Sequence, residues 1–237
     1  ETAKTLLQLA ENCNIVFLLV PSNASTSVST DFAATIQSGT FFLDLTTSLP
    51  SVKKENALRI NQSGGKYTDV SIMGTVATER YNVPLLLAGE HAADVQEIFE
   101  DIGLNSKVIS DAVGAAASIK MLRSIFMKGI EALLFETMLT AEKYQVRDDV
   151  MDSISTTMKN NEFEKLADTL IITHIKHRER RQKEVKESIS LVKEAGIYPF
   201  VTEGVLSFFS NSIAAAKPDS AAQDNVRDIL QHELEKI

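Results

Sequence analysis

Cysteine, tryptophan and long apolar runs are scarce in this sequence. One cysteine, Cys13, stands among 237 residues, and there is no tryptophan. A single cysteine excludes an internal disulfide framework and suits a reducing compartment, so we expect a cytoplasmic protein. The longest strongly apolar run, Ile15 to Val20, is far too short to cross a bilayer, so no membrane association is expected.

Basic residues are outnumbered as well. There are 24 Lys and Arg residues against 32 Asp and Glu residues, which gives a formal net charge of −8. Phosphate contacts need a basic surface, so this balance excludes a general nucleic-acid binder. The four histidines form no cluster with cysteine. His174 and His177 have a spacing that can hold a metal, but no third ligand is evident, so we expect no metal site.

Residues 1–111 alternate short apolar runs with amphipathic stretches. This alternation predicts an α/β domain, in which helices cover a mainly parallel sheet. Strands are expected at 14–20, 40–45, 66–72, 84–88 and 106–109, and helices at 22–37, from Pro50 onward and at 91–102. The helix that begins at Pro50 is expected to expose Lys53, Lys54 and Glu55 to solvent.

Residues 112–237 carry helical patterns without strand signals, which predicts an all-α domain. A long helix over 113–144 has apolar positions almost all round its axis, so it should be buried between domains or between subunits. Further helices are expected at 148–159, 162–195 with a break near Thr173, 202–216 and 221–237. One small helical domain cannot cover this much apolar surface, so we expect a homodimer joined through the helical domain.

Three segments stand out by their order and spacing: DLTTSLP at 44–50, DVSIMGT at 69–75 and GAAASIK at 114–120. They are similar to the D-x-S-T-x-x-P, D-A-P-V-S-G-G and G-x-G-x-x-x-K motifs of the β-hydroxyacid dehydrogenase family, the relatives of 6-phosphogluconate dehydrogenase. An H-x-x-R-R-x-x-E pattern over 177–184 resembles a less characterised branch of that family. The resemblance covers 14–200. It implies a partial Rossmann domain, a helical dimerisation domain and a nicotinamide cofactor, either NAD or NADP.

The sequence also departs from the family's pattern. It lacks the G-x-G-x-x-G loop that holds the cofactor pyrophosphate, and it is expected to begin just before the fourth Rossmann strand, with about 60 residues missing. The family's S-G-G loop reads Met73-Gly74-Thr75 here, and the asparagine four residues after the family's lysine is Ser124. These changes bear on the identity of the substrate more than on the type of reaction.

Lys120 is the candidate catalytic residue. It lies between Ile119 and Met121 in an apolar stretch, where a lysine must either reach the surface or serve a function. The resemblance implies that it is an acid/base, and a partly desolvated lysine with a lowered pKa can remove or return a hydroxyl proton during hydride transfer. Ser124 lies one turn later on the same face. It would bind the substrate hydroxyl or Lys120, or bond the carbonyl four residues back.

Two further groups of residues are expected at the ends of strands, where α/β sheets bind ligands. Val20, Pro21 and Thr47 would border the nicotinamide by resemblance, although Thr47 is also placed to cap the helix that follows. Gly74 and Thr75 could expose backbone N–H groups to an anionic substrate, and the plain alternative is an ordinary turn.

A basic run at 177–183 is unusual in this acidic chain. Such a run is most often a solvated helix face. The resemblance instead places this helix over the active site, where Arg181 would bind an anionic substrate and Lys183 a cofactor phosphate.

Two functions remain open from the sequence. The first is an NAD(P)-dependent oxidoreductase acting on a hydroxy acid or related carbonyl compound. Imine reduction is an alternative within this class, but relatives that reduce imines usually lack the lysine, and Lys120 argues against it. The second is a non-catalytic dimeric scaffold or ligand-sensing protein that has kept the fold. The sequence does not distinguish NAD from NADP, because that choice depends on a residue after the second Rossmann strand.

Overall fold

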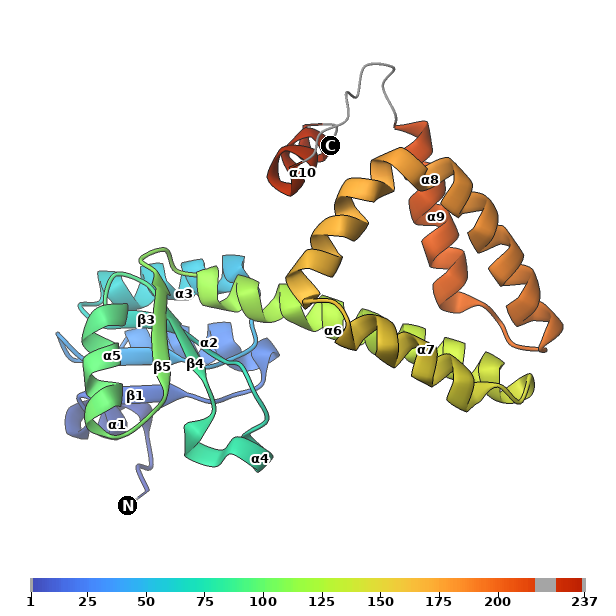
Figure 1. The fold of residues 1–237 in the computed structure, drawn as a ribbon. Coiled ribbons are helices and arrows are strands. Elements are labelled where there is room, and N and C mark those ends of the chain that lie inside the picture. Colours follow the sequence, from blue (N-terminus) through green and yellow to red (C-terminus); the bar gives the residue numbers. More distant parts are fainter. Residues whose placement is uncertain (1, 216–224, 236–237) are drawn as a thin grey trace. The chain divides into compact units, whose positions relative to one another are not determined.

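The computed structural model describes residues 2–215 and 225–235. The chain divides into two compact units, residues 1–127 and 128–237 (Figure 1). The first unit holds a five-stranded sheet, and the described residues of the second are helices and their connections. This order, α/β first and all-α second, confirms the fold class that the sequence predicts.

The sheet of the first unit follows the chain order. Its strands are β1 (Ile15–Leu18), β2 (Phe41–Asp44), β3 (Lys66–Ile72), β4 (Leu85–Ala88) and β5 (Ser106–Ser110). All neighbouring strands are parallel except β3 and β4, which are antiparallel. The sheet is therefore mainly parallel, as expected for a partial Rossmann domain.

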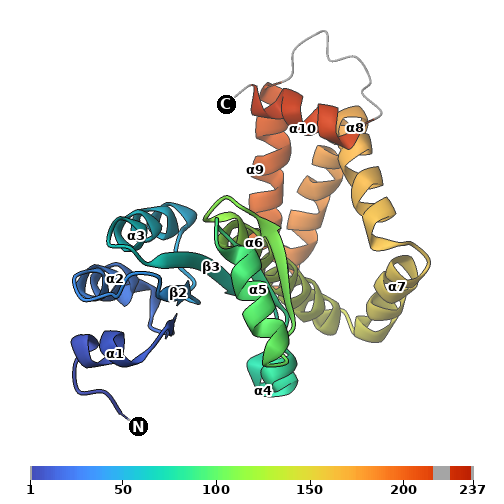
Figure 2. The same ribbon diagram turned by 90° about the vertical axis from the view of Figure 1, so that its left-hand side faces the viewer.

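Helices cover both faces of this sheet (Figure 2). One face packs against α1 (Leu6–Asn12), α2 (Ser25–Ala33) and α3 (Pro50–Gln62), and the other against α5 (Ala92–Asp101). A short turn η1 (Ser22–Ala24) precedes α2, and the connection from β3 to β4 contains α4 (Val76–Glu79) and η2 (Arg80–Asn82). Because both faces are covered, β1 and β4 are almost continuous apolar runs, whereas β3 also carries the buried polar residues Thr68, Asp69 and Ser71.

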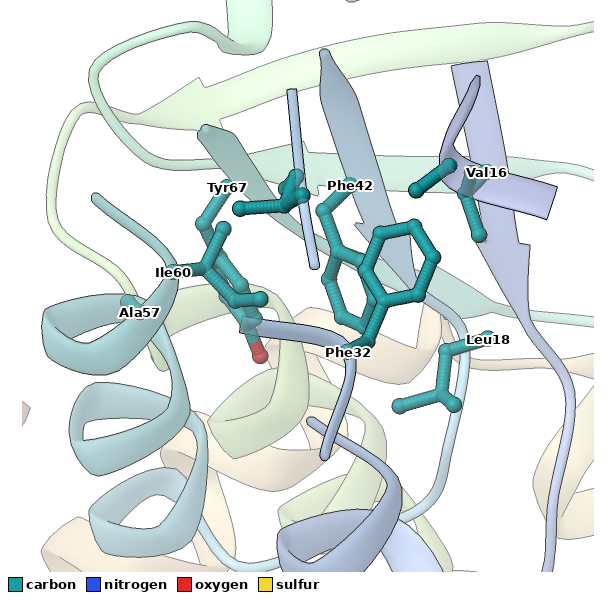
Figure 3. Close-up of a cluster of buried hydrophobic side chains, with 9 residues drawn as sticks. Val16, Leu18, Phe32, Phe42, Ala57, Ile60 and Tyr67 are labelled. Atoms are coloured by element: carbon teal, nitrogen blue, oxygen red, sulfur yellow. The ribbon is translucent and has the colours of Figure 1, made fainter. Parts of the chain in front are cut away.

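An aromatic cluster forms the core beneath α2 and α3 (Figure 3). The rings of Phe32 and Phe42 have centroids 5.4 Å apart, and those of Phe42 and Tyr67 are 6.0 Å apart. All three side chains are at most 1% exposed. Burial of such rings contributes strongly to stability, and it also brings the hydroxyl of Tyr67 into the interior.

The second unit is built on long helices. Helix α6 (Ala115–Lys143) is continuous across the division between the units and is followed by α7 (Arg147–Lys159), α8 (Phe163–Glu194), α9 (Phe200–Ala214) and α10 (Val226–Leu234). Helix α8 has no break in its helical hydrogen bonding, but Figures 1 and 2 show that it bends sharply part-way along. The Thr173 hydroxyl donates to the Thr169 carbonyl, a bond that tends to bend helices. Because α8 runs as one helix from Phe163 to Glu194, the break that the sequence predicts near Thr173 is not present.

Helix α9 is anchored at its start by a buried carboxylate. Glu136 on α6 accepts hydrogen bonds from the backbone N–H groups of Val201 and Thr202, at 2.8 and 3.0 Å, and from the Thr202 hydroxyl. This satisfies N–H groups that the first turn of a helix leaves unpaired. The predicted helices at 202–216 and 221–237 correspond to α9 and α10. Ala216, 221–224 and 236–237 lie outside the described residues.

Many apolar side chains of α6 are exposed within a single chain. Leu122, Ile125 and Phe135 are 65%, 70% and 69% exposed. The sequence predicts that this helix is buried, but the described residues of one chain leave much of its apolar surface exposed. None of the helices in the described ranges combines the length and apolarity needed to cross a membrane.

Candidate active site

Two buried aspartates lie side by side on neighbouring strands, Asp44 at the carboxyl end of β2 and Asp69 in the middle of β3. Asp44 and Asp69 are register partners on these parallel strands. Both side chains are fully buried, and adjacent strands are only about 4.8 Å apart. Two carboxylates this close repel each other strongly in a low dielectric, so they need a cation or hydrogen-bond donors.

Lys53 supplies that cation. Its Nζ lies 2.9 Å from Asp44 Oδ1 and 3.3 Å from Asp69 Oδ1, and it donates to the Asp44 carbonyl at 2.6 Å. The side chain is 0% exposed. The sequence-based expectation that Lys53 faces solvent together with Lys54 and Glu55 is therefore wrong for Lys53. It faces inward because the inner stripe of α3 is formed by residues 53, 56, 57 and 60.

Donors surround the carboxylate of Asp44. Thr46 donates to Oδ1 from its N–H at 2.9 Å and from its hydroxyl at 2.6 Å, and the Tyr67 hydroxyl donates to Oδ2 at 2.7 Å. Burial alone would raise the pKa of Asp44, but the charge of Lys53 and these hydrogen bonds outweigh it and lower that pKa. Burial and the neighbouring Asp44 carboxylate raise the pKa of Tyr67 well above its usual range. Asp44 is thus held ionised and Tyr67 neutral.

Asp69 connects this charged cluster to α6. Its Oδ2 accepts hydrogen bonds from the backbone N–H groups of Gly114 and Ala117, each at 3.1 Å. A carboxylate at this position satisfies unpaired N–H groups and interacts favourably with the helix dipole. The direction of the first turn of α6 is therefore fixed by a strand residue whose other oxygen faces Lys53.

Gly114 allows α6 to start close to α3. Its φ is +95°, and a Cβ there would lie 3.1 Å from the Cβ and 3.2 Å from the carbonyl oxygen of Pro50. Glycine adopts this conformation without the strain that a side chain brings. The spacing between Gly114 and Lys120 in the sequence thus reflects a tight helix start followed by a lysine in the second turn.

Lys120 is half-buried on α6. Burial lowers the pKa of its amine, the charge of Lys53 lowers it further, and Asp69 partly opposes both effects. A buried environment disfavours the charged ammonium form, and a nearby positive charge does the same. Lys120 is therefore partly desolvated and its pKa is shifted downward, which is the direction that favours a neutral amine able to accept a proton.

Comparison with known proteins follows this division of the chain. Residues 1–114 match the family model described as the NAD binding domain of 6-phosphogluconate dehydrogenase. The first unit belongs to that family. Residues 141–211 match a second model, a domain of unknown function designated DUF1932. The first match lies within the α/β unit, and the second lies within the helical unit.

Similar proteins include both hydroxyacid dehydrogenases and imine reductases. The chain is 23% identical over 208 residues to an uncharacterized 28.5 kDa protein of Methanothermus fervidus, covering 88% of this chain and 79% of that protein. It is 25% identical over 134 residues to the mitochondrial 3-hydroxyisobutyrate dehydrogenase of Mus musculus. This match covers 54% of this chain and 40% of that protein. The solved structure of an imine reductase from Aspergillus terreus has a TM-score of 0.75 at 15% identity, covering 97% of this chain and 82% of that one. This last likeness concerns the fold alone.

The candidate nicotinamide residues of the NAD-binding domain lie at the carboxyl ends of β1 and β2. These strands pair in parallel, and the Leu45 N–H bonds the Leu18 carbonyl at 3.1 Å. Val20 and Pro21 follow β1, and Thr47 follows β2 with its side chain exposed. No side chain caps α3, so neither Thr46 nor Thr47 is its N-cap. The edge carries no charged side chain at these positions, which suits the neutral amide of a nicotinamide.

The candidate substrate residues of the first unit differ in their surroundings. Ser124 is half-buried one turn after Lys120. Gly74 and Thr75 are exposed after β3, and the Thr75 N–H donates to Glu79 Oε1 at 2.9 Å. An anionic substrate at this turn would compete with the Glu79 carboxylate for that N–H group.

Arg181 and Lys183 lie on α8 in the second unit. Arg181 is half-buried and donates from Nη2 to the Thr173 hydroxyl at 2.8 Å, whereas Lys183 is exposed. Arg181 also lines a cavity of about 660 Å³ between α8, α9 and α10. His174 in the same cavity contacts the Ser212 hydroxyl at 2.8 Å. The described residues contain no group of three or more metal-ligating side chains placed to hold a metal ion.

Sequence reasoning missed the roles of Asp44, Asp69 and Lys53, although both aspartates open motifs that it identified. A signal for them was present. Each aspartate ends or interrupts a buried apolar run, and Lys53 shares a helical stripe with Ala57 and Ile60, which are core residues. A charged residue on an apolar stripe indicates a buried partner.

Proposed function

We propose that this protein is an NAD(P)-dependent oxidoreductase of the β-hydroxyacid dehydrogenase type. It transfers a hydride between nicotinamide and a small hydroxy acid or a related carbonyl compound. The observation that carries the proposal is Lys120, a half-buried lysine with a lowered pKa on a helix anchored to the NAD-binding domain. The similarity to a hydroxyisobutyrate dehydrogenase supports this substrate class.

Lys120 acts as the acid/base of the reaction. In the oxidation direction, its neutral amine accepts the hydroxyl proton of the substrate, and in the reduction direction its ammonium returns a proton to the carbonyl oxygen. Ser124 lies on the same helix face and hydrogen-bonds the substrate hydroxyl. Nicotinamide, when bound, accepts or supplies the hydride. Val20, Pro21 and Thr47 border it at the carboxyl edge of β1 and β2.

The substrate is an anion in this proposal. Backbone N–H groups at Gly74 and Thr75 bind its carboxylate after displacing the side chain of Glu79. Arg181 adds a charge-assisted contact to the substrate, and Lys183 binds a phosphate of the cofactor. A homodimer joined through the helical domain is part of the same proposal, because the exposed apolar side chains of α6 need a covering partner.

A panel of hydroxy acids tested with both NAD⁺ and NADP⁺ on the full-length protein examines this function. We expect reduced nicotinamide to form with at least one C2–C4 hydroxy acid, and no product when the matching acid without the hydroxyl group is used. Cofactor binding without turnover on the whole panel would favour the non-catalytic scaffold. Turnover of cyclic imines in place of hydroxy acids would favour imine reduction instead.

A further inference from the structure

Lys53 is a buried cation that the proposed reaction does not use. Its ammonium group is fully enclosed and contacts Asp44 and Asp69. Burying an ammonium group is expensive, and the four inward residues of α3 also include the polar Asn56, which donates to the Ser25 hydroxyl at 3.0 Å. A cluster this polar beneath the start of a catalytic helix calls for a role beyond packing.

The contacts of Asp69 indicate that role. One oxygen, Oδ1, forms an ion pair with Lys53 at 3.3 Å without a hydrogen bond, and the other, Oδ2, accepts hydrogen bonds from the N–H groups of Gly114 and Ala117 at 3.1 Å. A carboxylate is planar, so fixing one oxygen fixes the direction of the other. The ammonium of Lys53 therefore orients the group that holds the first turn of α6, and Lys120 follows Ala117 by three residues, less than one further turn.

We propose that Lys53 is a positioning residue for Lys120, acting through Asp69 on the first turn of α6. The inference rests on the proposed function, since it concerns the acid/base that the reaction uses. Lys53 itself has no route to a substrate, because its side chain is 0% exposed.

The charges around Lys120 give the proposal a measurable signature. Lys53 on α3 and Asp69 on β3 act on it directly and in opposite directions. Asp44 on β2 forms an ion pair with Lys53, and the Tyr67 hydroxyl donates to Asp44. Arg123 on the same helix is exposed. Removing Lys53 takes away a positive charge and leaves two carboxylates uncompensated, so the pKa of Lys120 should rise. Removing the charge of Asp69 should lower it.

The test compares Lys53→Met and Asp69→Asn with the matched control Lys54→Met, which alters an exposed lysine on the same helix. Each full-length variant is assayed for kcat and KM across pH. In parallel, its lysines are ¹³C-dimethylated, and Lys120 is titrated by NMR, its signal assigned by its loss in Lys120→Arg. We expect kcat to fall about tenfold to a hundredfold in both buried-site variants, as small displacements of a catalytic group do. We expect the pKa of Lys120 to move upward in Lys53→Met and downward in Asp69→Asn, and Lys54→Met to change neither quantity.

If the role of Lys53 is merely structural, both variants should melt at lower temperatures, but the titration of Lys120 and the kcat of the folded protein should not change. That result would overturn the inference. If Lys53→Met does not fold, Asp69→Asn and the charge-preserving Lys53→Arg decide the question, and Lys53→Arg should keep the wild-type pH profile. The proposed function fails separately. If Lys120→Met retains turnover, Lys120 is not the acid/base, while the NMR titration still measures whether Lys53 and Asp69 control its environment.

Discussion

Gly114 is the position at which a single methyl group should disturb the site most clearly. Gly114→Ala forces an L-residue to adopt a φ of +95° and places a Cβ 3.1 Å from the Cβ and 3.2 Å from the carbonyl oxygen of Pro50. Strain of this kind costs about 1–3 kcal/mol. The entropy that alanine removes from the unfolded chain, about 0.4–1 kcal/mol, offsets only part of this cost. We expect a net loss of about 1–2 kcal/mol in the free energy of unfolding.

The same helix contains a control of opposite sign. Gly129 lies inside α6, and a Cβ there meets nothing within 4 Å. Gly129→Ala should therefore stabilise by up to about 1 kcal/mol through helix propensity alone.

Denaturant titration of both variants measures these changes, with circular dichroism as the probe. Gly114→Ala should also lower kcat, because the clash moves the N–H group that bonds Asp69 and shifts the start of the helix carrying Lys120. Equal stabilisation by both substitutions would refute the argument that Gly114 is required by its conformation and by Pro50.

Two further predictions concern the helical unit. Ile125 is 70% exposed in one chain, and burying an isoleucine contributes about 1.5–3 kcal/mol. Ile125→Glu should therefore convert a dimer to monomers in sedimentation measurements. A wild-type protein that sediments as a monomer would refute the dimer. Arg181→Ala should raise KM for an anionic substrate and Lys183→Ala should raise it for a phosphorylated cofactor, each more at low than at high ionic strength. A KM that does not change would assign these residues to a solvated helix face.

The sequence predicts the fold well because its local signals agree with the tertiary structure. β3 lies at 66–72 as expected, and β1, β2 and β4 lie inside the predicted runs. The helix predicted at 22–37 is less accurate, since the turn η1 occupies Ser22–Ala24 and α2 already ends at Ala33. Helix α1 was not predicted, because its seven residues give too short a pattern to distinguish from a loop.

The site is harder to predict from sequence because it depends on register. Asp44 and Asp69 are 25 residues apart, and only the pairing of β2 with β3 brings them together. Lys53 points inward because of the way α3 is rotated about its axis against the sheet. This rotation is hard to infer from the sequence, because three consecutive charged residues, Lys-Lys-Glu, are typical of an exposed helix face. Lys120 could be selected as a candidate because its apolar setting and the glycine six residues earlier are local and its motif resembles that of the family, and its catalytic role stays a prediction.

The turnover number of Lys120→Met in the full-length protein tests the central claim most directly. It should be measured beside Lys128→Met, which alters an exposed lysine two turns further along α6, and beside the dissociation constant for the nicotinamide cofactor. We predict that kcat falls by about 10² or more in Lys120→Met, that cofactor affinity changes little, and that Lys128→Met keeps wild-type values. Near wild-type turnover in Lys120→Met, with the protein folded and the cofactor bound, would contradict the assignment of Lys120 as the acid/base.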